Sequence, residues 1–400
     1  MTDTAGALDG VRVLDIATMG AGPWIGTRLA DFGAEVIKVE HPTRPDPFRG
    51  LSPQRDGVAL WWKSDWRNHR AMTLDLKNDA GRDLALRLAA EADVLIENFR
   101  PGTLEAWGLG WEVLRRVNQR LVMVRATGWG QTGPYARRPG FGTLAEAASG
   151  LAHLNGWPDD PPTLPPLALG DQITSVLGAY ATMVALYERD RPGGSGQGQV
   201  IDLAISEAVY SLLGLQTIVH DQLGETLVRT GNVWGRAAPR NIYRCGDGQW
   251  IAIAASTPSI FANIMRAIGR PELLDDPRFH DPEARAAHRA ELDEIMAAWL
   301  SVRTRDEALE VLMSEGGVAP VHDAASLAKD PHNVARELIT TVDDPELGDV
   351  QVANVRPILG RTPGRVRHLG RPHGADTEEI LAGLGLSDEE VAVLREQGTV

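Results

Sequence analysis

Short apolar runs alternate with segments of helical periodicity along the first half of the chain. Residues 11–17 (VRVLDIA), 34–40 (AEVIKVE) and 72–77 (MTLDLK) have the length and composition of buried strands. Residues 79–91 place apolar side chains at four-residue intervals, and a further apolar run, 92–99 (ADVLIENF), follows them. Because strands and helices alternate in this way, the pattern predicts βαβ units, a parallel sheet and a Rossmann-like α/β domain.

Turn-forming residues separate this region from the rest of the chain. Residues 128–170 are dense in glycine and proline, and an apolar helix is predicted over residues 171–190. From about residue 225 the pattern changes to short strands and short helices. We therefore expect a large domain of residues 1–224, to which residues 330–400 return, and a smaller α+β domain of residues 225–329.

Composition narrows the possible partners. The formal net charge of the 400-residue chain is −14, which argues against nucleic acid or an anionic membrane as a partner. Cys245 is the only cysteine and the histidines lack metal-ligand spacing, so we expect no disulfide and no metal site. The first ten residues, MTDTAGALDG, lack the pattern of a signal peptide, and no apolar run approaches the ~18 residues of a membrane helix. A cytoplasmic protein is expected.

A glycine-rich turn, GAGPWIG, follows the first predicted strand, and Glu40 ends the second. This order is similar to a dinucleotide-binding fingerprint, but the third glycine comes one residue late. Trp24 also stands where a pyrophosphate would approach the backbone. NAD binding is therefore disfavoured, and the turn either closes a βαβ unit or binds another nucleotide-bearing ligand.

Asp171 lies in the segment PPLALGDQ, at the start of the predicted apolar helix. An Asp in front of a helix is usually an N-cap. A poorly hydrated carboxylate is also a good nucleophile and general base, and Gly170 beside it would let a large substrate approach. The segment is thus compatible with a helix cap or with a catalytic residue.

Five segments of the chain occur in a recognisable order: VLDIATMGAGP, GAEVIKVEHP, LDLK, ADVLIENFRPGTLEAWGLG and ALGDQITSVLGAYATMVALYER. From about residue 8 to residue 370 the chain resembles the class III CoA-transferases, the formyl-CoA and carnitine-CoA transferase family. The resemblance implies a Rossmann-like large domain, a smaller domain and a homodimer whose chains are interlaced as linked rings. It also implies that CoA, as part of the acyl-CoA substrate, binds the large domain with its thioester against Asp171. No other cofactor is expected.

The implied reaction moves CoA from an acyl-CoA thioester to a free carboxylic acid. The Asp171 carboxylate attacks the thioester, and the CoA thiolate attacks the resulting anhydride to leave an aspartyl-CoA thioester. The incoming acid reverses these steps and leaves as the new acyl-CoA. Water must be excluded because it would hydrolyse the anhydride. The segment GFGTLAEA…PPTLPPLALGD looks most like members that act on dicarboxylic acids, so succinyl-CoA is the expected donor.

The resemblance also assigns binding residues. Positions expected to contact CoA are Gly20, Ala21, His41, Leu74, Asp75, Lys77, Asn98, Phe99 and Arg100. Positions expected to contact the substrate are Arg137, Phe141, Gly142 and Gly170. Two interpretations remain open for a further set of arginines: they bind a phosphate or a carboxylate, or they lie solvated on the surface. These are Arg137, Arg138, Arg229, Arg236 and Arg240.

Two other functions are weighed against CoA transfer. A 2-methylacyl-CoA racemase or isomerase of the same fold places a His where this chain has Phe141, and phenylalanine cannot transfer a proton. A CoA-binding or assembly protein without activity would require that Asp171 lacks covalent reactivity. Formyl-CoA transferases carry Gln at the position of Gly20, which disfavours formyl or oxalyl substrates here.

Overall fold

The computed structural model describes residues 5–235 and 237–400, and the chain divides into two compact units. Unit 1 contains the chain up to Ala152, then Leu164–Thr226 and Arg336–Val400. Unit 2 contains His153–Thr163 and Leu227–Ala335. Residues 153–163, which we expected in the large domain, therefore fall in unit 2.

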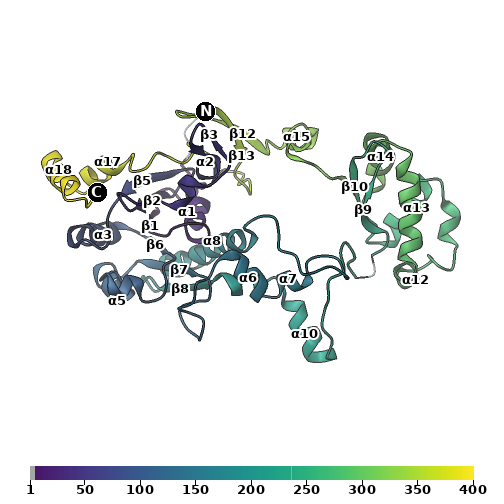
Figure 1. The fold of residues 1–400 in the computed structure, drawn as a ribbon, viewed down its shortest axis with the longest axis horizontal. Helices are drawn as coiled ribbons and strands as arrows, with labels where there is room; N and C mark the ends of the chain where they lie inside the picture. Colours follow the sequence, from purple (N-terminus) through teal and green to yellow (C-terminus); the bar gives the residue numbers. More distant parts are fainter. Residues whose placement is uncertain (1–4, 236) are drawn as a thin grey trace. The chain divides into compact units, whose positions relative to one another are not determined.

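Unit 1 is built on a six-stranded parallel sheet, which confirms the predicted α/β fold (Figure 1). In spatial order the strands are β5 (His69–Thr73), β2 (Glu35–Glu40), β1 (Arg12–Asp15), β6 (Val94–Glu97), β7 (Val122–Thr127) and β8 (Val200–Ala204). The strand order reverses between β1 and β6, so the chain leaves these two neighbours in opposite directions. Ligands of open parallel sheets bind in the crevice at such a point, beyond the carboxyl ends of the strands.

Strand β5 begins three residues before the predicted run 72–77. His69 and Arg70 extend it because their backbones pair in register with Val36 and Ile37 of β2. The position of this strand is therefore set by its neighbour in the sheet rather than by its own apolar residues.

Helices cover both faces of the sheet (Figure 1). One face carries α1 (Ala21–Ala30) and α8 (Leu169–Asp190), and the other carries α3 (Asp79–Glu91). Val13 of β1 packs with α1 and α8, whereas its neighbour Leu14 packs with α3. Successive side chains of a strand point to opposite faces, so adjacent apolar residues fill two different cores.

Helices α1 and α8 approach each other closely because Gly178 of α8 has no side chain. A Cβ atom at this position would lie 2.5 Å from Cδ1 of Ile25 in α1. Near the beginning of both helices, Gly20 and Asp171 are also in contact. The two helices therefore run in the same direction, and their N-terminal ends lie side by side.

The remaining elements of unit 1 are short. The helices are η1 (Pro47–Gly50), α2 (Leu60–Asp65), α4 (Thr103–Ala106), α5 (Trp111–Val117), α6 (Gly142–Ala148), α9 (Ile205–Tyr210), α10 (Gly214–Leu223), α17 (Thr377–Gly383) and α18 (Asp388–Glu396). The boundary between the two units falls within α7 (Leu151–Leu154). The strands are β3 (Gln54–Arg55), β4 (Val58–Ala59), β12 (Ile339–Asp344) and β13 (Gly348–Ala353). The C-terminal segment binds the edge strand β5, where Asp376 accepts a hydrogen bond from the Ala71 amide at 2.7 Å.

Unit 2 has a three-stranded antiparallel sheet in the order β11 (Val318–Pro320), β10 (Trp250–Ala254) and β9 (Arg240–Arg244). Strands β9 and β10 form an antiparallel hairpin, which turns at Asp247 and Gly248, and the φ of Gly248 is 82°. The helices of unit 2 are α11 (Pro258–Ala267), η2 (Pro271–Leu274), α12 (Pro282–Ala287), α13 (Arg289–Ser301), α14 (Arg305–Leu312), η3 (Met313–Glu315), α15 (Ala324–Leu327) and α16 (Pro331–Ala335). Unit 2 has its own apolar core.

Candidate active site

Buried polar side chains hold the loop between β1 and α1 by its backbone. Asn98, which follows β6, accepts a hydrogen bond from the Thr18 amide at 2.8 Å and donates one to the Thr18 carbonyl oxygen at 2.5 Å. The Asp46 carboxylate accepts a hydrogen bond from the Met19 amide at 3.0 Å. Met19 has a φ of 63°, a conformation that a non-glycine residue adopts only when its surroundings hold it. The loop therefore has one defined conformation.

Lys38 supplies the positive charge at the base of this loop. Its ammonium group is 0% exposed, donates a hydrogen bond to the Ala17 carbonyl oxygen, and lies 3.9 Å from Asp15 and 3.6 Å from Asp46. Asp15 in turn accepts a hydrogen bond from the Ala17 amide at 3.0 Å. Burial raises the pKa of Asp15 to about 6, although the charge of Lys38 acts in the opposite direction. The residue types alone did not identify this cluster.

Asp171 is not the N-cap of α8. It is the third residue of the helix, and the N-cap position is held by Ala168, which has no side chain to accept a hydrogen bond. Glu146 of α6 caps the helix instead, because its carboxylate accepts a hydrogen bond from the Gly170 amide at 2.7 Å. The Asp171 carboxylate thus remains free of the capping role that we had considered for it.

Two glycine backbones lie against the Asp171 carboxylate. A Cβ at Gly142 would lie 2.5 Å from Oδ2 of Asp171, and a Cβ at Gly20 would lie 3.3 Å from Cγ. We expected Gly170 to leave room for a large substrate, but Glu146 fills the space beside it. A Cβ at Gly170 would lie 3.3 Å from Cγ of Glu146. Side chains at positions 20 or 142 would therefore displace the carboxylate.

Burial and a negative neighbour determine the ionisation of Asp171. Burial and, as the smaller cause, the charge of Glu146 together raise its pKa to about 6. Within residues 5–235 and 237–400, no side chain forms a salt bridge with this carboxylate. A poorly hydrated carboxylate without a counter-charge is a stronger base and nucleophile than a solvated one.

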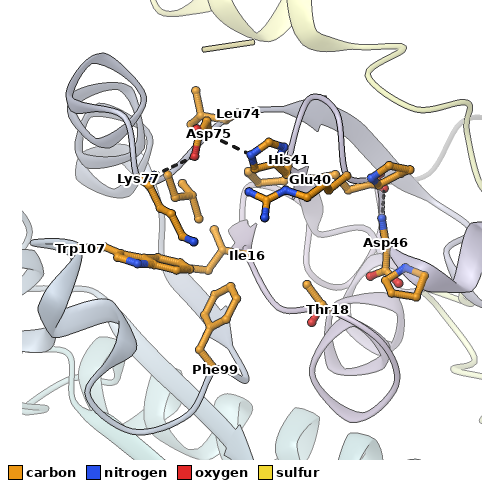
Figure 2. A pocket seen from close by; sticks show the side chains of 15 residues that line it. Ile16, Thr18, Glu40, His41, Asp46, Leu74, Asp75, Lys77, Phe99 and Trp107 are labelled. Carbon is orange, nitrogen blue, oxygen red and sulfur yellow. Dashed lines mark hydrogen bonds and ion pairs between the residues drawn. The ribbon is translucent and has the colours of Figure 1, made fainter. Parts of the chain in front are cut away.

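A cavity of about 350 Å³ lies beyond the carboxyl ends of β1, β2 and β6 (Figure 2). Five residues expected to contact CoA line it: His41, Leu74, Asp75, Lys77 and Phe99. Asp171 is not among the lining residues. Thr18 is, however, and only Met19 separates it from Gly20, which contacts Asp171. The cavity and the carboxylate therefore lie at the two ends of the same clamped loop.

The cavity combines apolar walls with a few polar groups. Phe99 and Trp107 meet edge to face with ring centroids 5.0 Å apart, and Nζ of Lys77 lies 5.4 Å from the Trp107 ring centroid (Figure 2). Across the cavity, Nε2 of His41 lies 3.7 Å from Oδ2 of Asp75. Burial and then the charge of Arg44 lower the pKa of His41. Aromatic surfaces beside a lysine are suited to a base stacked next to a phosphate.

Other expected residues have different surroundings. Asn98 clamps the loop instead of lining the cavity. Ala21 packs in a small apolar cluster at the start of α1, and Arg100 is exposed outside the cavity lining. Phe141 is the N-cap residue of α6 and is 61% exposed. Arg137 is exposed on the preceding loop.

The other arginines considered in the sequence analysis have different surroundings. The guanidinium of Arg138 stacks over the Tyr135 ring at 4.1 Å. In unit 2, Arg229 donates hydrogen bonds to the carbonyl oxygens of His153 and Asp160, so it stabilises that unit. Arg240 is part of β9. Arg236 lies outside the described residues.

Residues 128–140 form a loop next to the site, called the lobe below, whose two ends lie in contact. A Cβ at Gly128 would lie 2.5 Å from Cα of Gly140, so the two backbones meet at the base of the lobe. Trp129 closes the base further by donating a hydrogen bond to the Pro139 carbonyl oxygen at 3.0 Å. The lobe carries Arg137 and ends beside Gly142, which contacts Asp171.

The described part of the chain has neither a metal-binding cluster nor a helix that could span a membrane. No group of three or more His, Cys, Asp or Glu side chains there could hold a metal ion. None of the described helices combines the length and apolarity needed to cross a membrane.

Three comparisons relate the chain to known proteins. A model of CoA-transferase family III matches residues 8–377. The chain is 44% identical over 392 residues to the succinyl-CoA–D-citramalate CoA-transferase of Chloroflexus aurantiacus, covering 97% of this chain and 96% of the relative. It is 41% identical over 393 residues to the succinyl-CoA–L-malate CoA-transferase alpha subunit of Chloroflexus aurantiacus, covering 97% and 91%. The solved structure of a CaiB/BaiF family protein from Brucella suis matches 95% of this chain and 100% of its own, with a TM-score of 0.84 at 32% identity.

Removing the charge of Lys38 tests the loop clamp. In Lys38→Met the carboxylates of Asp15 and Asp46 stay buried without a cation, so we expect the free energy of unfolding at pH 7 to fall by roughly 3–5 kcal/mol. Urea denaturation followed by tryptophan fluorescence measures the change. Lys329→Met, at an exposed position of unit 2, should alter it by less than about 0.5 kcal/mol. Equal urea midpoints for the two variants would contradict the proposed role of Lys38 in holding the loop.

Proposed function

The chain belongs to CoA-transferase family III, and we propose that it transfers CoA from succinyl-CoA to a second dicarboxylic acid through a thioester on Asp171. The family membership confirms the resemblance and the enzyme class predicted from the sequence. The single observation that carries the proposed nucleophile is the half-buried carboxylate of Asp171, which lies between Gly20 and Gly142 and forms no salt bridge with the described residues. Both relatives described above are named for succinyl-CoA as donor and for citramalate or malate, which supports this choice of substrates.

The proposed chemistry has four balanced steps. Asp171 attacks the carbonyl carbon of succinyl-CoA, the C–S bond breaks, and an anhydride and the CoA thiolate form. The thiolate attacks the Asp171 carbonyl carbon, succinate leaves, and an aspartyl-CoA thioester remains. The second acid attacks this thioester to form a new anhydride and again the thiolate. The thiolate then attacks the acyl carbonyl, which releases the new acyl-CoA and the free Asp171 carboxylate.

The first turn of α1 is suited to stabilise the oxyanions of these steps. The unpaired N–H groups of a helix point toward its N-terminal end, and they carry part of the helix dipole. Gly20, the N-cap of α1, lies against the Asp171 carboxylate. An oxyanion that forms on the carbonyl under attack therefore develops next to these amides, where preorganised donors are most effective.

The nucleotide part of CoA is assigned to the cavity between Lys77 and His41. Its walls offer Phe99 and Trp107 for the base and Lys77 for a phosphate. The pantetheine arm then follows the clamped loop from Thr18 to Gly20, so that the thioester arrives at Asp171. Arg137, on the lobe beside Gly142, is the proposed contact for the distal carboxylate of a dicarboxylic acid.

A homodimer is part of the proposal. Helix α10 has no buried residue in the single chain, although it contains Leu215, Ile218 and Leu223. Helix α8 exposes Tyr180 and Tyr187, which are 66% and 70% accessible. Helices that expose such apolar faces are usually covered by a partner, and a second copy is the partner expected for this family. A cytoplasmic location is proposed because the single cysteine excludes stabilisation by an intrachain disulfide.

Replacing the nucleophile tests the proposed intermediate. Asp171→Ala should lose at least roughly 10³-fold in CoA transfer, because the covalent route is removed. The assay uses labelled succinyl-CoA and a panel of free acids, and borohydride or hydroxylamine quenching followed by peptide mapping locates the adduct in the wild type. The exposed Asp159→Ala serves as the control. Undiminished transfer by Asp171→Ala, or wild-type turnover without an adduct at position 171, would refute the mechanism.

The cavity assignment predicts a binding defect in Lys77→Ala. The KM for succinyl-CoA should rise roughly tenfold with kcat little changed, because a phosphate contact is made equally in the ground state and the transition state. Steady-state kinetics at constant ionic strength provide both constants. Lys329→Ala should leave them unchanged. A fall in kcat at constant KM would assign Lys77 to another step.

The assembly is tested by introducing charge on the exposed apolar helices. Analytical ultracentrifugation should find the wild type as a dimer and Tyr180→Asp combined with Ile218→Asp shifted toward monomer, because a buried unpaired charge opposes association. Val302→Asp introduces the same charge at an exposed apolar position in unit 2 and should remain a dimer. A monomeric wild type would exclude the proposed assembly.

A further inference from the structure

We propose that Glu146 is a positioning residue that drives acylation of Asp171: its buried carboxylate fixes the first turn of α8 and repels the nucleophile until the nucleophile becomes covalently neutralised. This inference rests on the proposed function, because it concerns the step in which Asp171 attacks the thioester. It assigns a role to a residue that the sequence analysis did not select.

The geometry holds Glu146 in one place. Its side chain is 2% exposed, and its Oε1 atom accepts a hydrogen bond from the Gly170 amide at 2.7 Å. A Cβ at Gly170 would lie 3.3 Å from Cγ of Glu146, so the glycine leaves just enough room for it. The N-cap Ala168 cannot make this bond. Glu146 thus replaces the missing cap and brings a negative charge to the residue next to Asp171.

Few charged side chains act on Asp171 from the elements around it. Glu146 on α6 acts on it directly and, after burial, raises its pKa. Arg28 on α1 instead donates a hydrogen bond to the Gln172 side chain at 2.6 Å. Glu207 on α9 is exposed. The repulsion between the two carboxylates is therefore not offset by a cation in the described part of the chain.

The repulsion depends on the chemical state of Asp171. As a free carboxylate, Asp171 is destabilised both by burial and by Glu146. As an anhydride or a thioester it carries no charge, so both penalties disappear. Glu146 therefore raises the free energy of the unreacted enzyme relative to the acylated one, and it makes the free carboxylate more basic. Both effects favour attack on the incoming thioester.

The alternative is that Glu146 only caps α8. Glu146→Gln separates the two roles because the amide oxygen can still accept the hydrogen bond from Gly170, while the charge is lost. Glu146→Ala removes both. Glu207→Gln is the matched control, since it removes an exposed carboxylate from the neighbouring α9.

The test measures kcat/KM for succinyl-CoA from pH 4.5 to 8.5 and the fraction of Asp171 trapped as a covalent adduct at steady state. Asp171 reacts as a carboxylate and its pKa is raised to about 6, so wild-type kcat/KM should be full above this value and fall as the pH drops through it. In Glu146→Gln this fall of kcat/KM on the acidic side, the acid limb of the profile, should move to lower pH, because the charge that raises the pKa of Asp171 is lost. The plateau at pH 8 should fall roughly tenfold, and less Asp171 should be trapped. Glu207→Gln should match the wild type.

An unchanged acid limb and an unchanged trapped fraction in Glu146→Gln would overturn the proposal, even if Glu146→Ala were inactive, because the charge would then have no role. A Glu146→Ala variant that fails to fold leaves the Gln variant as the decisive measurement. If the wild type itself carries no adduct at position 171, the proposed function fails instead. The two failures are thus distinguishable.

Discussion

The proposed mechanism depends on one constraint, which is that the Asp171 carboxylate stays anionic in poorly hydrated surroundings without a cation to neutralise it. Such a carboxylate would turn toward water if its helix could move, so the frame around Asp171 must be rigid. Gly178 provides part of this rigidity, because it lets α8 pack directly on Ile25 of α1. Gly20 and Gly142 close on the carboxylate from two other segments. The absence of side chains at these glycines is therefore what positions the reactive group.

The same frame connects binding to chemistry. Thr18 lines the cavity and Gly20 contacts Asp171, and the short segment between them is held by Asn98 and by the charges around Lys38. A ligand that occupies the cavity thus meets a loop that cannot shift independently of the nucleophile. In the proposed binding mode, the thioester would then need little additional ordering at the moment of reaction, which is one of the main sources of catalysis.

The sequence predicted the features that follow from local periodicity and chain order. His41, Lys77 and Phe99 follow different strands but meet at one cavity, because the carboxyl ends of parallel strands share an edge of the sheet. Glu146 and Lys38 were missed, since their roles arise from contacts with backbone groups far away in the chain. Local patterns carry no information about such contacts. The start of β5 was misplaced for the same reason, as β2 determines it.

The proposed mechanism requires that the anhydride on Asp171 is protected from water. Behind Gly20, an aromatic cluster that includes Trp24, Phe48 and Trp66 seals the inner side of the site. On the outer side, Phe141 is largely exposed beside Gly142, although a hydrolysable intermediate forms there in the proposed mechanism. Bound substrate and a second chain are the two available covers for that side. The proposed homodimer would therefore account both for the exposed apolar helices and for the exposed side of the site.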